Sequence, residues 1–299
     1  MYEDRLVYKS TVQEDGRTLE SVLRRRLELS GSMIKTLKYN KGLLINREPA
    51  RTVDLVQSGD EITVLLNVTD KKPEIAPEKL PLEILYEDNA LIALNKEAGT
   101  VVHPTCLHQS GTLSHALAWY MEQHNIPGTI HPVSRLDKDT CGVVLFARNG
   151  FVQEQLKKQD QTGQFRKVYY GICSPPPPCS QGTICLPIKR APDTIMLRTV
   201  AEDGARAVTE YRVIASMEEH MALVEFLLHT GRTHQIRVHT SYLGFPLVGD
   251  ELYGGRTDTK LPVHGQALFA GQVSFLHPVT RRLLCITAPK PKWWPTVQE

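Results

Sequence analysis

The sequence predicts a two-domain protein in which both domains combine helices with strands. Its 299 residues correspond to about two domains at the usual ~150 residues per domain. Helical spacing and then short strand-like runs occupy the region before residue 67, and strands alternate with helices after residue 81. Residues 67–81 hold three prolines and six charges without periodicity, which is typical of a linker. We therefore expect a small domain at 1–70, a linker at 71–81 and a larger domain at 82–299.

The composition is that of an ordinary globular protein. Hydrophobic residues make up 41% and charged residues 23%, which excludes a disordered or fibrous chain. Lys and Arg number 35 against 33 Asp and Glu, so a net charge of +2 leaves nucleic-acid affinity to depend on how charge is arranged. No apolar run approaches the ~20 residues of a membrane span, and acidic residues stand where a signal peptide would be basic. A cytoplasmic protein that does not enter membranes is expected.

The six cysteines fit reduced thiols of an intracellular enzyme. Cys173, Cys179 and Cys185 are evenly spaced, which raises the alternative of a zinc site. They contain no CxxC pair, however, and no histidine lies among them. Buried or loop thiols are the better interpretation.

The predicted small domain begins with two helices. Apolar residues recur at helical spacing in the first, namely Leu19, Val22, Leu23 and Leu27. Ser32 is a suitable N-cap for a second short helix that carries Ile34 and Leu37. Residues 43–46 and 62–66 then have the apolar, β-branched composition of strands.

Basic residues cluster in the same region. Seven lie between residues 24 and 47 against one acidic residue, Glu28; they are Arg24, Arg25, Arg26, Lys35, Lys38, Lys41 and Arg47. One interpretation is the solvated face of two amphipathic helices. The other is a phosphate-binding surface, because clustered Lys and Arg displace counterions from a polyanion. On the second interpretation the candidate RNA contacts are Arg24, Arg25, Lys35, Lys38 and Lys41.

The order of three short motifs in this region resembles the S4-type RNA-binding module. The motifs are SGSMI at 30–34, KGLLIN at 41–46 and SGDEI at 58–62. The resemblance covers about fifty residues and implies a small RNA-binding α/β unit, with RNA as the partner.

The larger domain contains a polar turn that leads into a buried strand. The turn is HPVSRLDKDTCG at 131–142, and the apolar run GVVLFA at 142–147 follows. A loop fixed at the edge of a rigid strand is a common place for catalytic residues. Asp137 is the candidate there, whereas Asp139 and Thr140 are typical turn residues. The alternative that all three only shape the turn stays open.

A second segment, residues 231–244, predicts a short helix. Thr233 is a suitable N-cap and Gly244 a suitable C′ residue, so that Arg237 lies one turn inside the helix on the face of Thr233. His234 and His239 are five residues apart, unlike an HExxH metal pair, and we interpret both as ordinary polar helix residues.

Two further segments place polar groups on strands. Residues 165–171 predict a strand on which Lys167 and Tyr169 share a face. Residues 95–104 predict a strand end and turn that include Lys96 and His103. Spacing alone does not show that the four segments meet.

Together these segments resemble a pseudouridine synthase of the RluA-like branch. SRLDKDTCG at 134–142 stands where that branch has HRLDxxTSG, and further matches follow in order: NK at 95–96, GTVVHP at 99–104, KVY at 167–169, GRTHQIRVH at 231–239, GFPLVGD at 244–250, LYG at 252–254, QAL at 266–268 and HP at 277–278. The resemblance implies an α+β catalytic domain with a bent, largely antiparallel sheet, flanking helices and a central cleft. It implies isomerisation of uridine in RNA, without cofactor or metal.

The resemblance also assigns roles to residues. Asp137 corresponds to the essential aspartate, Arg237 to its ion-pair partner, and Tyr169 to the aromatic residue packed on the uracil. Arg135 corresponds to an arginine that holds the extruded nucleotide or the space it leaves. Burial favours a neutral carboxyl group, whereas a guanidinium keeps it anionic. The carboxylate then acts as nucleophile at C1′ or accepts a sugar proton, and the sequence does not decide between these chemistries. Further candidate RNA contacts are Lys96, His103, Lys167, Arg232 and Thr233.

The motif departs from the family pattern at two positions. Ser134 replaces the common histidine and Cys141 the common serine, and neither is the expected reacting group. A rival interpretation is a non-catalytic RNA-binding or ribosome-assembly factor, which the presence of all three catalytic candidates disfavours. A metal-dependent hydrolase lacks a suitable set of ligands. The sequence leaves open whether the RNA is ribosomal or transfer RNA, and a monomer is expected.

Overall fold

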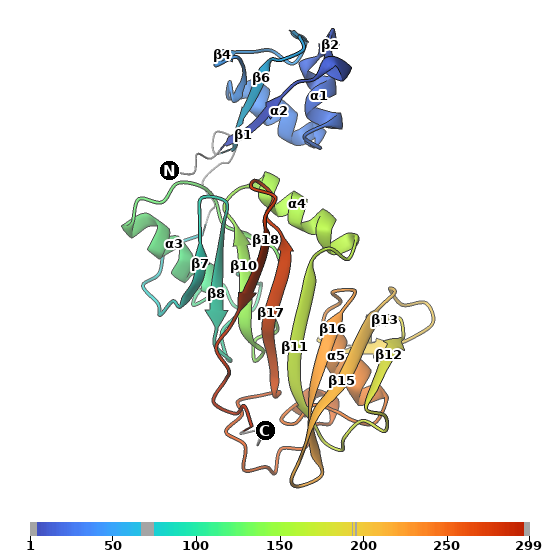
Figure 1. Cartoon of the computed structure of the whole chain (residues 1–299). Coiled ribbons are helices and arrows are strands. Elements are labelled where there is room, and N and C mark those ends of the chain that lie inside the picture. Colours follow the sequence, from blue (N-terminus) through green and yellow to red (C-terminus); the bar gives the residue numbers. More distant parts are fainter. Residues whose placement is uncertain (1–4, 67–74, 193, 195, 296–299) are drawn as a thin grey trace.

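The computed structural model describes residues 5–66, 75–192, 194 and 196–295, and it contains two main sheets (Figure 1). Four strands form the first sheet in the order β1-β6-β3-β4: Arg5–Lys9, Glu61–Leu65, Leu43–Ile45 and Glu48–Pro49. A separate two-stranded ladder joins β2 (Arg17–Thr18) to β5 (Leu55–Val56). Residues 71–74 of the expected linker lie outside the described residues.

Two helices pack on the first sheet, α1 (Leu19–Arg25) and α2 (Gly31–Tyr39). A short 3₁₀ turn, η1 (Val12–Glu14), precedes them. The predicted N-cap of α2 is wrong. Ser30, not Ser32, has the extended backbone of a cap, and its hydroxyl accepts a hydrogen bond from the Met33 amide. The apolar residues of both helices are buried, as their spacing predicted, except that α1 ends at Arg25 and leaves Leu27 half-buried beyond it.

The second sheet has ten strands and carries the candidate site. Its main order is β12-β15-β16-β11-β17-β10-β8-β7, with β18 beside β17 and β9 beside β10. Only the β10–β17 pair is parallel among the described ladders of this sheet. The strands are β7 (Ile84–Glu87), β8 (Leu91–Lys96), β9 (His131–Pro132), β10 (Cys141–Ala147), β11 (Arg166–Cys173), β12 (Gln181–Cys185), β15 (Val208–Met217), β16 (Met221–Leu228), β17 (Leu268–Leu276) and β18 (Leu283–Thr287). The predicted largely antiparallel α+β architecture is confirmed.

Helices cover both faces of the sheet at β10, whose apolar side chains point to both sides and are buried. Along β10, Val144 and Phe146 share a cluster with α3 (Leu113–Gln123), whereas Val143 and Leu145 share another with α4 (Gly150–Gln161). Near the β12 edge lie α5 (Gln235–Tyr242), a two-stranded ladder of β13 (Ile188–Arg190) and β14 (Arg198–Val200), and the 3₁₀ turn η3 (Glu251–Tyr253) (Figure 1). Among the described residues, no helix has the length and apolarity that a membrane span requires.

Candidate active site

The Asp137 loop connects β9 to β10 and is held close to β17. The Thr140 amide donates a hydrogen bond to the Asp137 carbonyl oxygen, 3.2 Å away, and this bond closes the turn. Gly142 then adopts a φ of +109°, and a Cβ atom there would lie 2.2 Å from the Ala270 carbonyl oxygen. Only glycine allows both this backbone conformation and this approach. The loop therefore presents Asp137, whose side chain is 24% exposed, from a rigid support.

Arg237 joins two carboxylates that are far apart in the sequence. Its Nη1 atom donates to Asp137 Oδ2 at 3.1 Å. Its Nε and Nη2 atoms donate to the two oxygens of Asp250 at 2.7 and 2.8 Å, a bidentate pair. Asp250 is 1% exposed, so the guanidinium is anchored from the protein interior and reaches Asp137 with its remaining nitrogen. The ion pair that the resemblance implied is present.

The surroundings of Arg237 preserve its positive charge. Burial works against the charge, but the hydrogen bonds and negative charges of Asp250 and Asp137 outweigh this effect and raise the pKa of Arg237. The ring of Tyr253 lies 5.0 Å from the guanidinium carbon, a cation–π contact on one face of the group. The cation beside Asp137 is therefore permanent and fixed in orientation.

Tyr169 forms an apolar wall beside the two charged groups. It lies on β11 opposite Ala270 of β17, directly after a bulge in that pairing, and it is 8% exposed. Burial raises the pKa of the phenol, and the negative charges of Asp137 and Asp160 act in the same direction. Tyr169 is therefore a neutral, flat side chain at physiological pH.

Asp137, Tyr169 and Arg237 line one open hollow of about 350 Å³, a volume that includes open solvent. Its other lining residues are Arg135, Leu136, Thr140, Leu228, Arg232, His234, Gln235, Ile236 and Leu268. A carboxylate and a flat aromatic wall in one partly apolar hollow can accommodate a planar, uncharged ring attached to a sugar.

His234 was interpreted from the sequence as an ordinary polar helix residue, and the structure places it in the hollow instead. Its Nε2 atom lies 3.8 Å from Asp137 Oδ1, and its Nδ1 atom lies 2.8 Å from the Tyr253 hydroxyl oxygen. Burial lowers the pKa of His234, although the Asp137 charge opposes the shift, so the ring is neutral at pH 7. The signal available in the sequence was the spacing of three residues between His234 and Arg237, which puts both on one helix face.

The predicted N-cap of α5 is also wrong. His234, not Thr233, occupies that position, with a left-handed φ of +58°. This backbone turns the His234 side chain toward the Asp137 loop, and Thr233 is exposed. Gly244 does take the left-handed conformation expected after the helix, at φ +82°.

The predicted RNA contact by Lys96 is wrong, because the side chain is fully buried behind the Asp137 loop. Its ammonium group donates to the carbonyl oxygens of Lys138 at 2.6 Å and Glu97 at 2.9 Å. Burial lowers its pKa to about 8, although the nearby Cys141, Asp139 and Asp137 oppose the shift. Lys96 thus supports the loop from below rather than touching RNA.

Lys167 is likewise buried, and its ammonium group lies 2.5 Å from Asp160 Oδ1. The prediction that Lys167 binds RNA directly is therefore wrong, because its charge is used in an ion pair with Asp160. His103 is half-buried and its Nδ1 atom is paired with the Ser114 hydroxyl, 3.1 Å away, outside the lining of the hollow.

Two arginines lie at the rim of the hollow. Arg135 is exposed and lines it, as does Arg232, whose Nε atom donates to the Arg206 carbonyl oxygen at 3.0 Å. Both side chains remain accessible to a phosphate group.

The two departures from the family motif differ in how well the structure explains them. Burial raises the pKa of Cys141 to about 11, although the Lys96 charge opposes the shift, so its thiol is protonated at neutral pH. Its Sγ atom faces the Leu268 carbonyl oxygen at 3.7 Å. Ser134 is half-buried, and no contact explains its identity. Within the described part of the chain, no three His, Cys, Asp or Glu side chains are placed to hold a metal ion, and all six cysteines are free.

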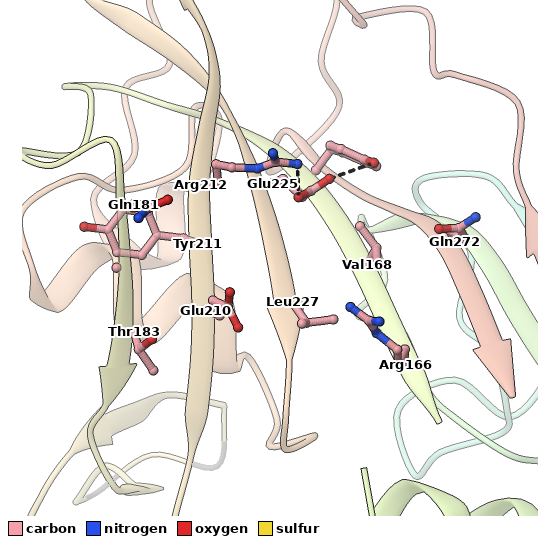
Figure 2. Close-up of a pocket in the computed structure, with 12 residues that line it drawn as sticks. Arg166, Val168, Gln181, Thr183, Glu210, Tyr211, Arg212, Glu225, Leu227 and Gln272 are labelled. Carbon is pink, nitrogen blue, oxygen red and sulfur yellow. Dashed lines mark hydrogen bonds and ion pairs between the residues drawn. The ribbon is translucent and has the colours of Figure 1, made fainter. Parts of the chain in front are cut away.

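A larger hollow lies on the opposite face of the sheet (Figure 2). On β11 it is lined by Arg166, Val168 and Tyr170, which alternate with Lys167 and Tyr169 of the candidate site. Figure 2 shows Arg212 reaching Glu225, a pair separated by 2.9 Å. The lining contains none of the three catalytic candidates, and its two arginines and two glutamates balance in formal charge. The smaller hollow is therefore the candidate active site.

The fold and site define a mixed α/β protein with an aspartate–arginine pair and an aromatic wall in one open hollow. Comparison with known proteins gives this class its family: residues 90–242 match the model of the RNA pseudouridylate synthases. The uncharacterised RNA pseudouridine synthase YjbO of Bacillus subtilis is 35% identical over 89% of this chain and 93% of its own length. The ribosomal large subunit pseudouridine synthase D of Xanthomonas campestris is 37% identical over 93% and 86%.

A solved structure agrees. Human RNA pseudouridylate synthase domain containing 4 superposes with a TM-score of 0.55 at 28% identity, over 70% of this chain and 88% of that one. The chain belongs to the RNA pseudouridine synthase family and is an RNA-modifying isomerase.

Proposed function

We propose that this enzyme converts uridines of large-subunit ribosomal RNA to pseudouridine, with Asp137 as the reacting carboxylate. The contact of Asp137 with Arg237 in the hollow beside Tyr169 carries the proposal. The choice of ribosomal over transfer RNA is supported by the similarity to the large-subunit enzymes of Xanthomonas and Xylella.

The reaction exchanges one bond of the ribose for another. The N1–C1′ bond breaks, the uracil turns, and a C5–C1′ bond forms; C5 then loses its proton and N1 gains one, so that the atoms balance without a co-reactant. Asp137 assists the first step as a nucleophile at C1′ or by accepting a sugar proton. Arg237 keeps that carboxylate anionic and oriented, and Tyr169 packs against the uracil ring.

The nucleotide reaches Asp137 only after it leaves its helix or loop. Extrusion of a base costs a few kcal/mol. We assign Arg135 and Arg232, at the rim of the hollow, to the phosphate contacts that offset this cost, together with Thr233.

Residues 1–70 act as an S4-type RNA-binding module attached to a catalytic domain at 82–299. The support is the exposure of Arg25, Lys35, Lys38 and Lys41. Lys35 and Lys38 are three residues apart on α2 and therefore share a face. Arg24 donates to Glu20 at 2.8 Å, a surface pair that is weak enough for a phosphate to replace it. We further propose that the enzyme works in the cytoplasm as a monomer.

Removing the positive charges of Lys35 and Lys38 is expected to weaken RNA binding and to make the affinity depend less steeply on salt concentration. For a variant with Lys35→Gln and Lys38→Gln, the slope of log K against log salt should become shallower by about 1 to 2, because fewer counterions are released. Filter binding of large-subunit rRNA at several salt concentrations measures the slope. Lys189→Gln with Lys290→Gln removes two charges from the catalytic domain as the control. Equal slopes for both pairs would assign α2 no part in RNA binding.

The substrate is tested by mapping pseudouridine at nucleotide resolution. RNA from a strain that lacks the gene is incubated with the purified enzyme and compared with untreated RNA. We expect new pseudouridines in large-subunit rRNA. New pseudouridines only in tRNA would overturn the substrate assignment, and none in any RNA would support the non-catalytic RNA-binding alternative.

A further inference from the structure

The imidazole of His234 lies between the reacting carboxylate and a tyrosine that no step above uses. Nε2 is 3.8 Å from Asp137 Oδ1, and Nδ1 is 2.8 Å from the Tyr253 hydroxyl oxygen. Tyr253 also stacks edge-on against the imidazole, with ring centroids 5.7 Å apart. Both nitrogens of the ring therefore face specific polar groups.

The contacts of Tyr253 determine which nitrogen carries the proton. The backbone amide of Arg198 can only donate, and it donates to the Tyr253 hydroxyl oxygen at 3.0 Å. Among the described residues, His234 Nδ1 is the other hydrogen-bond neighbour of this hydroxyl, so the hydroxyl proton is paired within the protein when it points to Nδ1. A neutral imidazole that accepts at Nδ1 carries its proton on Nε2. The N–H group of His234 then faces Asp137.

Asp137 needs a second donor because Arg237 holds only one of its oxygens. Arg237 Nη1 donates to Oδ2 of Asp137. The Nε and Nη2 atoms of the same guanidinium both donate to Asp250. A carboxylate held at one oxygen can still rotate about its Cβ–Cγ bond. A donor at Oδ1 would fix the plane in which the carboxylate meets the sugar.

We infer that His234 is a positioning residue that donates its Nε2–H to Oδ1 of Asp137 once the nucleotide closes the hollow. The present separation of 3.8 Å is longer than a hydrogen bond, and catalytic hydrogen bonds are commonly long before the substrate binds. The inference rests on the proposed role of Asp137. Tyr253 is the group that selects the tautomer, through the chain from the Arg198 amide.

Two amide substitutions at position 234 separate this role from a purely structural one. Glutamine places its N–H₂ group near the position of Nε2, whereas asparagine places it near Nδ1. Asparagine, however, tolerates the left-handed backbone at φ +58° better than glutamine does. If His234 donates to Asp137, His234→Gln should be more active than His234→Asn. If His234 serves only as the N-cap of α5, the order of activity should be reversed.

The assay is the release of tritium into water from large-subunit rRNA transcribed with uridine tritiated at C5. We expect His234→Gln to keep kcat within about threefold of the wild type, and His234→Asn and His234→Leu to lower it about 10- to 100-fold, because one hydrogen bond to a charged group is lost. KM should change little, since the carboxylate is not an RNA anchor. Tyr253→Phe, which keeps the ring but frees the tautomer, should lower kcat about tenfold. His229→Gln, on an exposed histidine paired with Glu210, is the matched control and should match the wild type.

Circular dichroism and thermal unfolding accompany each variant, and Tyr253→Phe tests the tautomer if a variant at position 234 fails to fold. Wild-type kcat in His234→Leu, or a higher kcat for His234→Asn than for His234→Gln, would overturn the inference. A wild-type enzyme that releases no tritium would instead count against the proposed substrate or chemistry.

Discussion

Replacing Asp137 by asparagine is expected to abolish pseudouridine formation, with kcat at least a thousandfold below that of the wild type. An amide is neither a nucleophile at C1′ nor a base, and loss of a reacting side chain removes factors of this size or more. The fold should survive because Asp137 is partly exposed and the amide oxygen can still accept from Arg237 Nη1. Tritium release and nucleotide mapping of the treated rRNA measure the loss.

The control for Asp137→Asn is the same change at Asp203, an exposed carboxylate that pairs with Lys189 of β13 and does not line the hollow. Asp203→Asn should have wild-type activity. Equal pseudouridine yields from Asp137→Asn and the wild type would remove the reacting role from Asp137 and leave the activity of the family to another group in the hollow.

Replacing Arg237 by methionine is expected to reduce both activity and stability. Asp250 would remain as a buried carboxylate without its bidentate partner, and breaking one side of a buried ion pair costs about 3 to 5 kcal/mol. Asp137 would lose the cation that holds Oδ2, so kcat should fall by about a hundredfold or more. Chemical denaturation gives the free energy of unfolding, and tritium release gives kcat.

A double variant separates the two effects of Arg237. Adding Asp250→Asn to Arg237→Met removes the buried unpaired charge, and it should recover at least half of the lost unfolding free energy without restoring activity. A double variant as unstable as the single one would show that the Asp250 charge is not the source of the loss. Recovered activity would show that Arg237 acts through stability alone.

The candidate site was largely readable from the sequence, because its reacting groups lie in short contiguous motifs. Asp137 precedes a strand in a turn that ends at Gly142, and Arg237 lies on a helix that ends before Gly244. Strand alternation predicted that Tyr169 shares a face with Lys167, and the family resemblance made it a site candidate. The roles of Asp250 and Tyr253 were missed, although both belong to matched motifs, since nothing local shows that they meet Arg237.

Burial was the property that sequence patterns predicted least well. Lys96 and Lys167 carry the positive charge expected of RNA contacts. Lys96, however, lies beneath the Asp137 loop, and Lys167 is paired with Asp160. Their environment is made by segments distant in sequence: Lys96 on β8 pairs with Gly142 on β10, and β10 in turn pairs with β17. Exposure of a charged side chain depends on which segments pack over it, and no local periodicity records that.

The sequence by itself predicted most helices and strands, because helix spacing, strand alternation and turn chemistry are local. Its ordered motifs predicted the family and the three candidate site residues through their resemblance to known proteins. Only the tertiary structure decided how those residues are held. Asp137 and Arg237 are 100 residues apart, and Asp250 anchors the guanidinium that joins them. Such contacts form when segments distant in the sequence pack together and exclude water. The groups that hold the Asp137 carboxylate in place therefore became visible only in the tertiary structure.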